Sequence, residues 1–225
     1  MIDEALPPGT RISGYVIERV LGQGGFAFTY LAHDEHLTDA KFALKEFYPL
    51  EIARRTQRVQ IQPMATRAEL YRDGLAQFIQ EGRALLRLRH TGIVRVHRYL
   101  EEHGTAYLVM DYIAGQSLQQ ALVDRPREFW HEARVRLLAT QILDALIEVH
   151  EAGLLHRDIN PSNILLDKRD RPTLIDFGAA RQRLAERSKN DRVATAGYSP
   201  PEQYDPDVGE QGAWSDLYSL GATLY

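Results

Sequence analysis

One stretch, residues 156–178, constrains the fold more than any other. It reads HRDINPSNILLDKRDRPTLIDFG, in which two short apolar runs, ILL and TLI, flank a polar turn. Two such runs joined by turn residues predict a β-hairpin. Asp158 and Asn163 precede the first strand, and Asp176 follows the second. The hairpin therefore predicts three oxygen-bearing side chains on one small scaffold.

Side chains of this kind suit a hard cation. Mg²⁺ prefers carboxylate and carbonyl oxygens and usually shares them with phosphates. An Asp-rich turn can arise by chance, and Asp-Phe-Gly alone would carry little weight. His-Arg-Asp, Asn163 and Asp-Phe-Gly in this order and spacing make coincidence rare.

Composition excludes several other classes of protein. The chain has 225 residues, enough for one large domain or two lobes. Its net charge of −4 argues against general nucleic-acid binding, and the absence of cysteine excludes disulfides and zinc–thiolate sites. Neither a signal peptide nor a run of roughly 20 apolar residues for a membrane span is predicted. We therefore expect a cytoplasmic chain with no nucleic-acid partner.

The first half of the chain predicts a mostly antiparallel sheet with one long helix. A glycine turn, residues 22–25, joins the first two strands. Glycine lets a backbone approach a ligand closely, although a plain hairpin turn would look the same. The expected strands cover residues 15–21, 26–32, 41–47, 93–100 and 105–111, with a further short strand near 59–61 and the helix over 75–88.

Several charged residues in this half are ambiguous when taken alone. Lys45 lies inside a strand among apolar neighbours, and Glu81 lies one turn from apolar helix residues. Each would more often face solvent than a site. Arg54, Arg55 and Arg58 form a basic cluster, which we interpret as a solvated surface.

The second half changes in character after residues 113–116, which we interpret as a linker. Helices are predicted over residues 117–123, 129–151 and 214–225, and residues 179–200 are interpreted as a surface loop. The apolar stripe of the long helix predicts core packing. The expected organisation is a leader (1–11), an N-terminal lobe (12–113) with an insertion at about 50–72, and a C-terminal lobe (114–225).

Taken together, the motifs resemble those of the eukaryotic-type protein kinase family, in its bacterial serine/threonine branch. The resemblance runs from about residue 12 to the last residue. It implies a bilobal α+β fold and transfer of the γ-phosphoryl group of ATP to a hydroxyl of a protein substrate. Its markers, in the family's order, are Gly22-x-Gly24, Ala43-x-Lys45, Glu81, Met110-Asp111-Tyr112, His156-Arg157-Asp158 with Asn163, Asp176-Phe177-Gly178, Pro201-Glu202 and Asp216.

The resemblance also implies the nucleotide contacts. Lys45 would offer its charge to the α- and β-phosphates, and Glu81 would hold Lys45 by an ion pair. The glycine turn would cover the phosphates with backbone donors. The other residues implied to contact ATP are Leu21, Gly22, Gly24, Ala43, Met110, Asp111, Ile113 and Leu165.

Catalytic roles follow from the same resemblance. Asn163 and Asp176 would hold Mg²⁺, with Mn²⁺ as a substitute. Asp158 would orient the substrate hydroxyl and accept its proton. Asp216 would bond to the backbone near His156.

Substrate class and regulation rest on fewer residues. Pro161, two residues before Asn163, resembles the serine/threonine pattern. Thr195, which would face Asp158, also favours serine or threonine over tyrosine. Arg157 beside Asp158 matches kinases whose activation loop is ordered by phosphorylation. The candidate acceptors are Ser188 and Thr195, and self-association through autophosphorylation is left open.

The chain departs from the family pattern at four places. Ala27 replaces the third glycine of the loop, and Asn160 replaces a lysine near the transferring phosphate. The insertion at 50–72 is either a docking surface or decoration of the lobe. No arginine partner for Glu202 follows, which indicates a fragment of a longer protein, whose remainder could include a membrane anchor.

Two alternative functions remain at this point. Ala27, Asn160 and the early end favour a pseudokinase that binds nucleotide without phosphoryl transfer. A small-molecule phosphotransferase of related fold is the other alternative. Glu202 and Asp216, which belong to a platform for protein substrates, argue against it.

Overall fold

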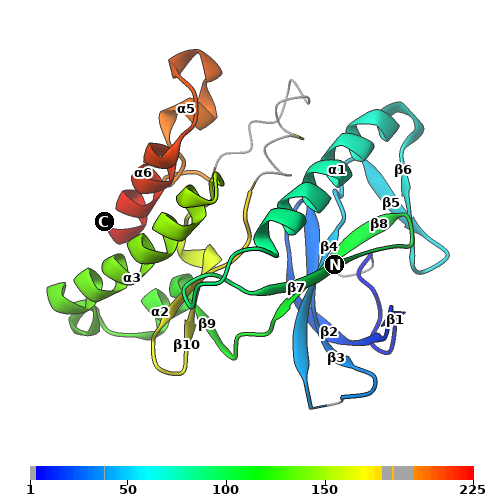
Figure 1. Cartoon of the computed structure of the whole chain (residues 1–225), viewed down its shortest axis with the longest axis horizontal. Helices are drawn as coiled ribbons and strands as arrows, with labels where there is room; N and C mark the ends of the chain where they lie inside the picture. Colours follow the sequence, from blue (N-terminus) through cyan, green and yellow to red (C-terminus); the bar gives the residue numbers. More distant parts are fainter. Residues whose placement is uncertain (1–3, 38, 179–183, 185–194) are drawn as a thin grey trace. The chain divides into compact units, whose positions relative to one another are not determined.

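The computed structural model describes residues 4–37, 39–178, 184 and 195–225 (Figure 1). The chain divides into two compact units. The first comprises Met1–Arg87 and Arg95–Tyr112, and the second comprises Leu88–Val94 and Ile113–Tyr225. Each unit is described by itself below.

The first unit is built on a six-stranded antiparallel sheet with the strand order β1-β2-β3-β4-β8-β7. The expected strands are confirmed, and a short N-terminal strand adds a sixth. Phe28, Tyr30 and Leu44 are fully buried, because successive side chains of a strand point to opposite faces and one face is packed. The strands are β1 (Arg11–Ile12), β2 (Tyr15–Gln23), β3 (Ala27–Asp34), β4 (Lys41–Phe47), β7 (Val96–Glu102) and β8 (Thr105–Asp111).

One long helix, α1 (Ala68–Leu85), packs against β7 and β8 (Figure 1). It begins earlier than predicted, after a 3₁₀ turn, η1 (Ala65–Arg67). The sequence did not predict the early start, because its first two turns mix apolar and charged residues and include Gly74. Packing is closest at Gly82, where an added Cβ would lie 2.4 Å from Leu108 Cδ2.

The insertion forms a hairpin of β5 (Ala53–Thr56) and β6 (Gln60–Pro63). The interpretation of Arg55 as a solvated residue is wrong, because its side chain is only 5% exposed and pairs with Glu46 of β4 at 2.7 Å. Glu46 has no exposed surface and also accepts the hydroxyls of Tyr30 at 2.8 Å and Tyr107 at 2.9 Å. We call these four residues the Glu46 cluster; it ties the insertion to the sheet.

The second unit combines helices with a three-stranded sheet in the order β11-β10-β9. The predicted central hairpin is confirmed as β10 (Ile164–Asp167) paired with β11 (Pro172–Leu174). Residues 113–116, interpreted from the sequence as a linker, belong in part to a strand, because β9 (Gly115–Ser117) pairs with β10. An added Cβ at Gly115 would lie 1.9 Å from the Leu166 carbonyl oxygen, so this approach requires glycine.

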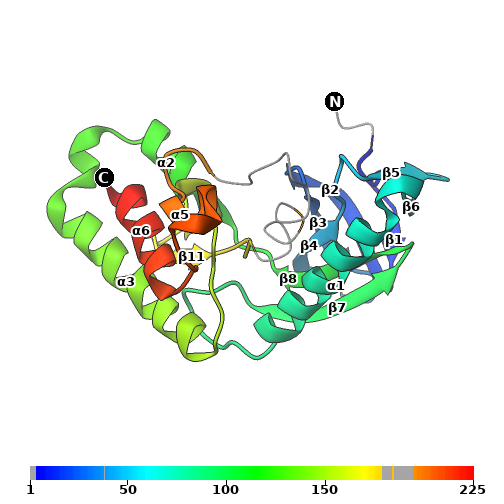
Figure 2. The same cartoon turned by 90° about the horizontal axis from the view of Figure 1, so that it is seen from above.

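The longest helix of this unit, α3 (Glu132–Glu151), runs beside α6 (Ala213–Leu224) in both views (Figures 1 and 2). Most of its predicted apolar stripe is buried, but Leu137 is 59% exposed. No helix in the described part of the chain is long and apolar enough to cross a membrane. The remaining elements are α2 (Leu118–Asp124), η2 (Arg127–Trp130), η3 (Pro161–Asn163), α5 (Pro201–Tyr204) and η4 (Pro206–Val208).

Candidate active site

Asp158 is the centre of the candidate site in the second unit. Asn163 Nδ2 donates to Asp158 Oδ2 at 2.8 Å and to the Asp158 carbonyl oxygen at 2.8 Å. The Thr195 hydroxyl donates to Asp158 Oδ1 at 2.7 Å, as the sequence predicted when it placed Thr195 opposite Asp158. The carboxylate is therefore held in one orientation and already accepts a hydroxyl hydrogen bond.

Asn160 has a local role that the sequence did not reveal. Its Nδ2 donates to the carbonyl oxygen and to Oδ1 of Asp158, at 3.0 and 3.1 Å. Its Oδ1 accepts the backbone N–H of Ser162 at 2.9 Å and so caps η3. The residue is 6% exposed, so it supports Asp158 from within the loop.

Asn163 and Asp176 lie close together because β10 and β11 meet at their ends. The Asn163 carbonyl oxygen accepts the N–H of Ile175 at 3.0 Å, one residue before Asp176. Because the Asn163 nitrogen donates to Asp158, the amide oxygen is the group that would bind a cation. Asp176 has φ of 58°, a left-handed conformation that non-glycine residues adopt rarely.

This donor set fits Mg²⁺ delivered with a nucleotide. One carboxylate and one amide oxygen suffice when phosphates supply further ligands. Within the described ranges there is no group of three or more His, Cys, Asp or Glu residues that could hold a metal without such help.

Asp216, in the first turn of α6, supports the loop that carries Asp158. It has no exposed surface and accepts the backbone N–H groups of His156 at 2.9 Å and Arg157 at 2.8 Å. This confirms the predicted contact. His150 Nε2 lies 2.8 Å from the same carboxylate, and the sequence carried no signal for it. Because Arg157 has φ of 66°, both N–H groups can point at one carboxylate.

His156 is fully buried, close to Asp158 and Asp216. Its ring centroid lies 4.5 Å from that of Phe177, and its Nε2 lies 3.0 Å from the Ile175 carbonyl oxygen. Burial lowers the pKa of His156, against the opposing effects of Asp216 and Asp158. The imidazole is therefore a neutral packing and hydrogen-bonding group.

The segment after Thr195 is tied to the same loop. Gln203 Nε2 donates to the Arg157 carbonyl oxygen at 2.8 Å, and Ser215 Oγ donates to Glu202 Oε1 at 2.6 Å. Neither contact was predicted, because lone amide and hydroxyl side chains carry no distinctive pattern. The other candidate phosphorylation site, Ser188, lies outside the described residues.

In the first unit, the glycine turn is tighter than predicted. Gly22 is still within β2, opposite Thr29 of β3. The chain reverses over residues 24–26, where the N–H of Gly24 donates to the Ala27 carbonyl oxygen at 2.9 Å. Ala27 thus begins β3, and its methyl group replaces the third glycine without disturbing the pairing of the two strands.

Lys45 and Glu81 are brought to the same part of this unit. Lys45 lies on β4 opposite Leu108 of β8. Glu81 is only 6% exposed on α1, and the next residue, Gly82, packs directly on Leu108. The structure therefore places the Lys45 strand and the Glu81 helical turn against one shared residue.

The predicted adenine contacts divide between the units. Ala43 and Met110 lie opposite each other on β4 and β8, and both are buried. Asp111, at the end of β8, hydrogen-bonds His97 Nε2 at 2.6 Å. Leu21 lies on β2 of the first unit, whereas Ile113 and Leu165 belong to the second unit.

Comparison with known sequences gives one family. A sequence profile described as "Protein kinase domain" matches residues 15–225. A serine/threonine-protein kinase of Streptomyces coelicolor is 34% identical over 96% of this chain, and serine/threonine-protein kinase PknA of Nostoc is 31% identical over 93%. The chain spans only 30% and 36% of the lengths of these two relatives.

Solved structures agree with the sequence comparison. A structure titled "PpkA-294 apo form" has a TM-score of 0.88 and 36% identity, covering 98% of this chain and 77% of that one. The kinase domain of PknI from Mycobacterium tuberculosis has a TM-score of 0.71 and 29% identity, covering 98% of this chain and 74% of that one.

Proposed function

Because the chain belongs to the protein kinase family and its named bacterial relatives are serine/threonine kinases, we propose that it transfers the γ-phosphoryl group of ATP to a serine or threonine hydroxyl of a protein. The proposal places this reaction in the cytoplasm, where ATP is supplied. The first unit contributes Lys45 to the phosphates and Glu81 to hold Lys45. The second unit contributes Asp158, Asn163 and Asp176.

The observation that carries this proposal is the hydrogen bond from Thr195 to Asp158. A hydroxyl 2.7 Å from Asp158 Oδ1 is within the reach that a general base requires. In the reaction a substrate hydroxyl takes this place. Its proton passes to Asp158 as its oxygen bonds to the γ-phosphorus, and the bond from that phosphorus to ADP breaks.

The residues around Asp158 serve positioning and charge. Asn163 and Asp176 would hold Mg²⁺, or Mn²⁺ in its place, which neutralises the phosphate charge when bound. Asn160 and Asn163 fix the carboxylate by hydrogen bonds. Asp216 fixes the backbone of the two residues before Asp158, His156 and Arg157. Since phosphoryl transfer depends mainly on positioning and electrostatics, this rigidity supports activity.

The direct test compares transfer of labelled phosphate by the wild type and by Asp158→Ala. Loss of a general base lowers a rate by about 10²–10⁴-fold. Asp144→Asn is the matched control, because Asp144 is an exposed carboxylate on α3 of the same unit. Equal transfer by wild type and Asp158→Ala would refute the proposal and leave a nucleotide-binding module.

We further propose that phosphorylation of Ser188 or Thr195 regulates the domain. The support is Arg157, whose Nε is buried and has no hydrogen-bond partner among the described residues. A phosphate can supply charged acceptors to such an arginine. Mass spectrometry after incubation with ATP and Mg²⁺ tests this; activity without modification of either residue would contradict it.

A further inference from the structure

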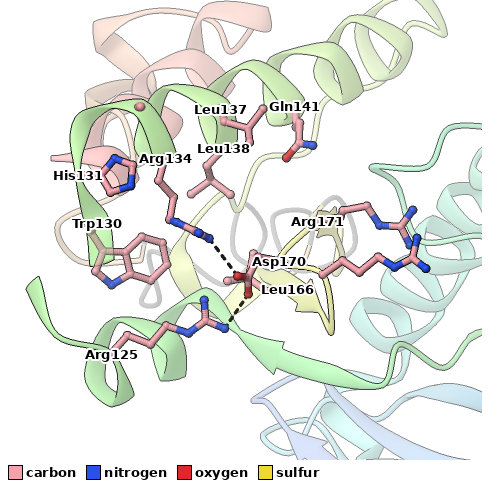
Figure 3. A pocket seen from close by; sticks show the side chains of 12 residues that line it. Arg125, Trp130, His131, Arg134, Leu137, Leu138, Gln141, Leu166, Asp170 and Arg171 are labelled. Atoms are coloured by element: carbon pink, nitrogen blue, oxygen red, sulfur yellow. Dashed lines mark hydrogen bonds and ion pairs between the residues drawn. The ribbon is translucent and has the colours of Figure 1, made fainter. Parts of the chain in front are cut away.

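A pocket of about 380 Å³ opens in the second unit at the start of α3 (Figure 3). Its walls come from the end of α2, from η2, from α3 and from the turn between β10 and β11. None of the residues proposed for catalysis lines it. It is therefore separate from the Asp158 site.

The pocket is strongly basic. Its lining includes four arginines, Arg125, Arg134, Arg169 and Arg171, against one carboxylate, Asp170. Arg171 also pairs at 2.7 Å with Asp167, which does not line the pocket, so the arginines still outnumber the two carboxylates. The chain as a whole carries a net charge of −4. A local positive field in an acidic chain selects anionic groups and speeds their encounter.

Two of the arginines are held in place by the chain itself. Asp170 accepts Arg125 Nη2 at 2.6 Å and Arg134 Nη1 at 3.0 Å, as the dashed lines in Figure 3 show. Both guanidinium carbons lie over the Phe129 ring, at 4.4 and 3.9 Å from its centroid. Asp170 itself adopts φ of 59°. The positive wall is thus preorganised, and it stays positive because one carboxylate serves two arginines.

This wall also has more donors than acceptors. Arg125 Nη1 and Trp130 Nε1 are buried, and neither has a hydrogen-bond partner in the described part of the chain. Buried polar groups in proteins nearly always find a partner. Two such donors in one wall add to the preference for a ligand that brings acceptors.

An apolar surface lies beside the charged one. Leu137 is 59% exposed although it sits in the apolar stripe of α3, and Leu138 and Leu166, which are buried, line the same pocket. A second hollow continues along α3 past Leu137 to Thr140. The combined surface suits a ligand with a carboxylate and a bulky apolar group side by side.

We propose that this pocket docks a linear segment of a protein substrate in which acidic residues adjoin a bulky apolar residue. A free phosphate would leave the exposed leucine uncovered, and the net charge of −4 disfavours nucleic acid. The inference rests on the proposed kinase function, which it extends by naming a feature of the substrates.

Direct binding tests this without phosphoryl transfer. Fluorescence anisotropy would compare three labelled peptides that differ in one block: Glu-Glu-Leu-Phe, Lys-Lys-Leu-Phe and Glu-Glu-Ser-Ser. The first should bind at least about tenfold more tightly than the others, since charge and apolar contact are both required. Equal binding of the acidic and basic peptides would overturn the proposal. Equal competition by inorganic phosphate would replace it with a small-anion site.

Two substitutions test the charged and the apolar contributions of the pocket to peptide binding. Arg169→Glu reverses an exposed charge, and Leu137→Ser removes the exposed apolar group. The double variant should weaken binding of the acidic–apolar peptide about tenfold or more. Arg72→Glu with Leu37→Ser, at exposed positions of the first unit, is the matched control and should bind as wild type does. Unchanged binding by the pocket variant would refute the assignment.

Kinetics complete the test. For a substrate peptide with the docking block attached, the pocket variant should raise KM about tenfold and leave kcat unchanged. For the same peptide without the block, both constants should stay as in wild type. A fall in kcat on both peptides would contradict docking. Peptide binding that persists in a chain without phosphoryl transfer would refute the kinase proposal alone.

Discussion

Two carboxylates, Glu46 in the first unit and Asp216 in the second, are equally buried, with no exposed surface. They differ in their partners. Glu46 accepts hydrogen bonds from side chains on β3, β5 and β8, whereas Asp216 accepts two backbone N–H groups of the loop before Asp158. One carboxylate joins strands and an insertion, and the other fixes a loop conformation.

This difference indicates which buried hydrogen bonds apolar side chains can replace. Side-chain partners can be replaced together by apolar residues, often without loss of stability. A backbone N–H can be removed only by substitution with proline, which the φ of 66° at Arg157 forbids, and burying an N–H unpaired is costly. We therefore expect that no second substitution restores the stability lost with Asp216, whereas replacing the partners of Glu46 as well should restore it.

The largest expected effect comes from Asp216→Ala. The buried N–H of His156 and the partly buried N–H of Arg157 would lose their acceptor, at a cost of up to about 1–3 kcal/mol each. The loop bearing Asp158 would lose its support at Arg157, which adopts φ of 66°. We expect phosphate transfer to fall about 100-fold or more, since misplacement of catalytic groups has effects of this size. Transfer at the wild-type rate would show that the loop does not depend on Asp216.

Next in size is Glu46→Gln, which leaves the buried Arg55 guanidinium without a charged partner. Such a change costs about 3–5 kcal/mol of unfolding free energy. A variant that replaces the whole cluster, Glu46→Leu with Arg55→Leu, Tyr30→Phe and Tyr107→Phe, should recover most of this loss, because it leaves no member of the cluster buried without its partner. Urea unfolding measures both variants. A fourfold variant as unstable as the single one would remove the contrast with Asp216.

The predictions from sequence succeeded where local pattern carried the information. The alternation of the strands and the turn residues of the β10–β11 hairpin are local signals, and the resemblance placed Asp216 near His156. Arg55 was misread because its partner, Glu46, lies in another strand, so that nothing near Arg55 in the chain marks it as buried. From the sequence alone, Asn160 could be interpreted only as a replacement for the family's lysine. Its role as the cap of η3 could not be predicted, because that role depends on side-chain geometry.

Acidification should distinguish the two regions further. Burial lowers the pKa of His156 below its usual value of about 6.5, so below that pH the unfolded chain binds a proton that the folded chain refuses. Stability contributed by neutral His156 is complete above pH 6.5 and declines as pH falls, by at most about 1.4 kcal/mol per pH unit. Thermal unfolding at pH 7.5 and 5.5 measures it, and His156→Phe should flatten the dependence. An unchanged slope in that variant would assign the effect elsewhere.

Arg55 and Tyr30 of the Glu46 cluster should not share this pH dependence. Burial alone would lower the pKa of Arg55, but its bonds to Glu46 raise it, so the guanidinium stays charged. The Tyr30 phenol also stays protonated, because burial and Glu46 raise its pKa. The Arg55 guanidinium and the Tyr30 phenol therefore keep their protons across the pH range that titrates His156.

Tyr30→Phe should destabilise the chain less than Glu46→Gln does. It removes the phenol's hydrogen bond to Glu46 and the acceptor of the Leu6 N–H but leaves the ion pair of Glu46 with Arg55 intact, so we expect a loss of about 1.5–3 kcal/mol, the range for hydrogen bonds to charged groups. Urea unfolding of Tyr30→Phe beside Glu46→Gln gives the comparison. If the two cost the same, the ion pair with Arg55 adds nothing to the cluster.

The Glu46–Arg55 pair also bears on the ancestry of the β5–β6 hairpin. A lineage that gained only one of the two residues would pass through a form with a buried unpaired charge and would be selected against. The two residues should therefore appear or vanish together among relatives. A glutamate directly after the strand lysine, Lys45 in this chain, then serves as a sequence marker for the hairpin.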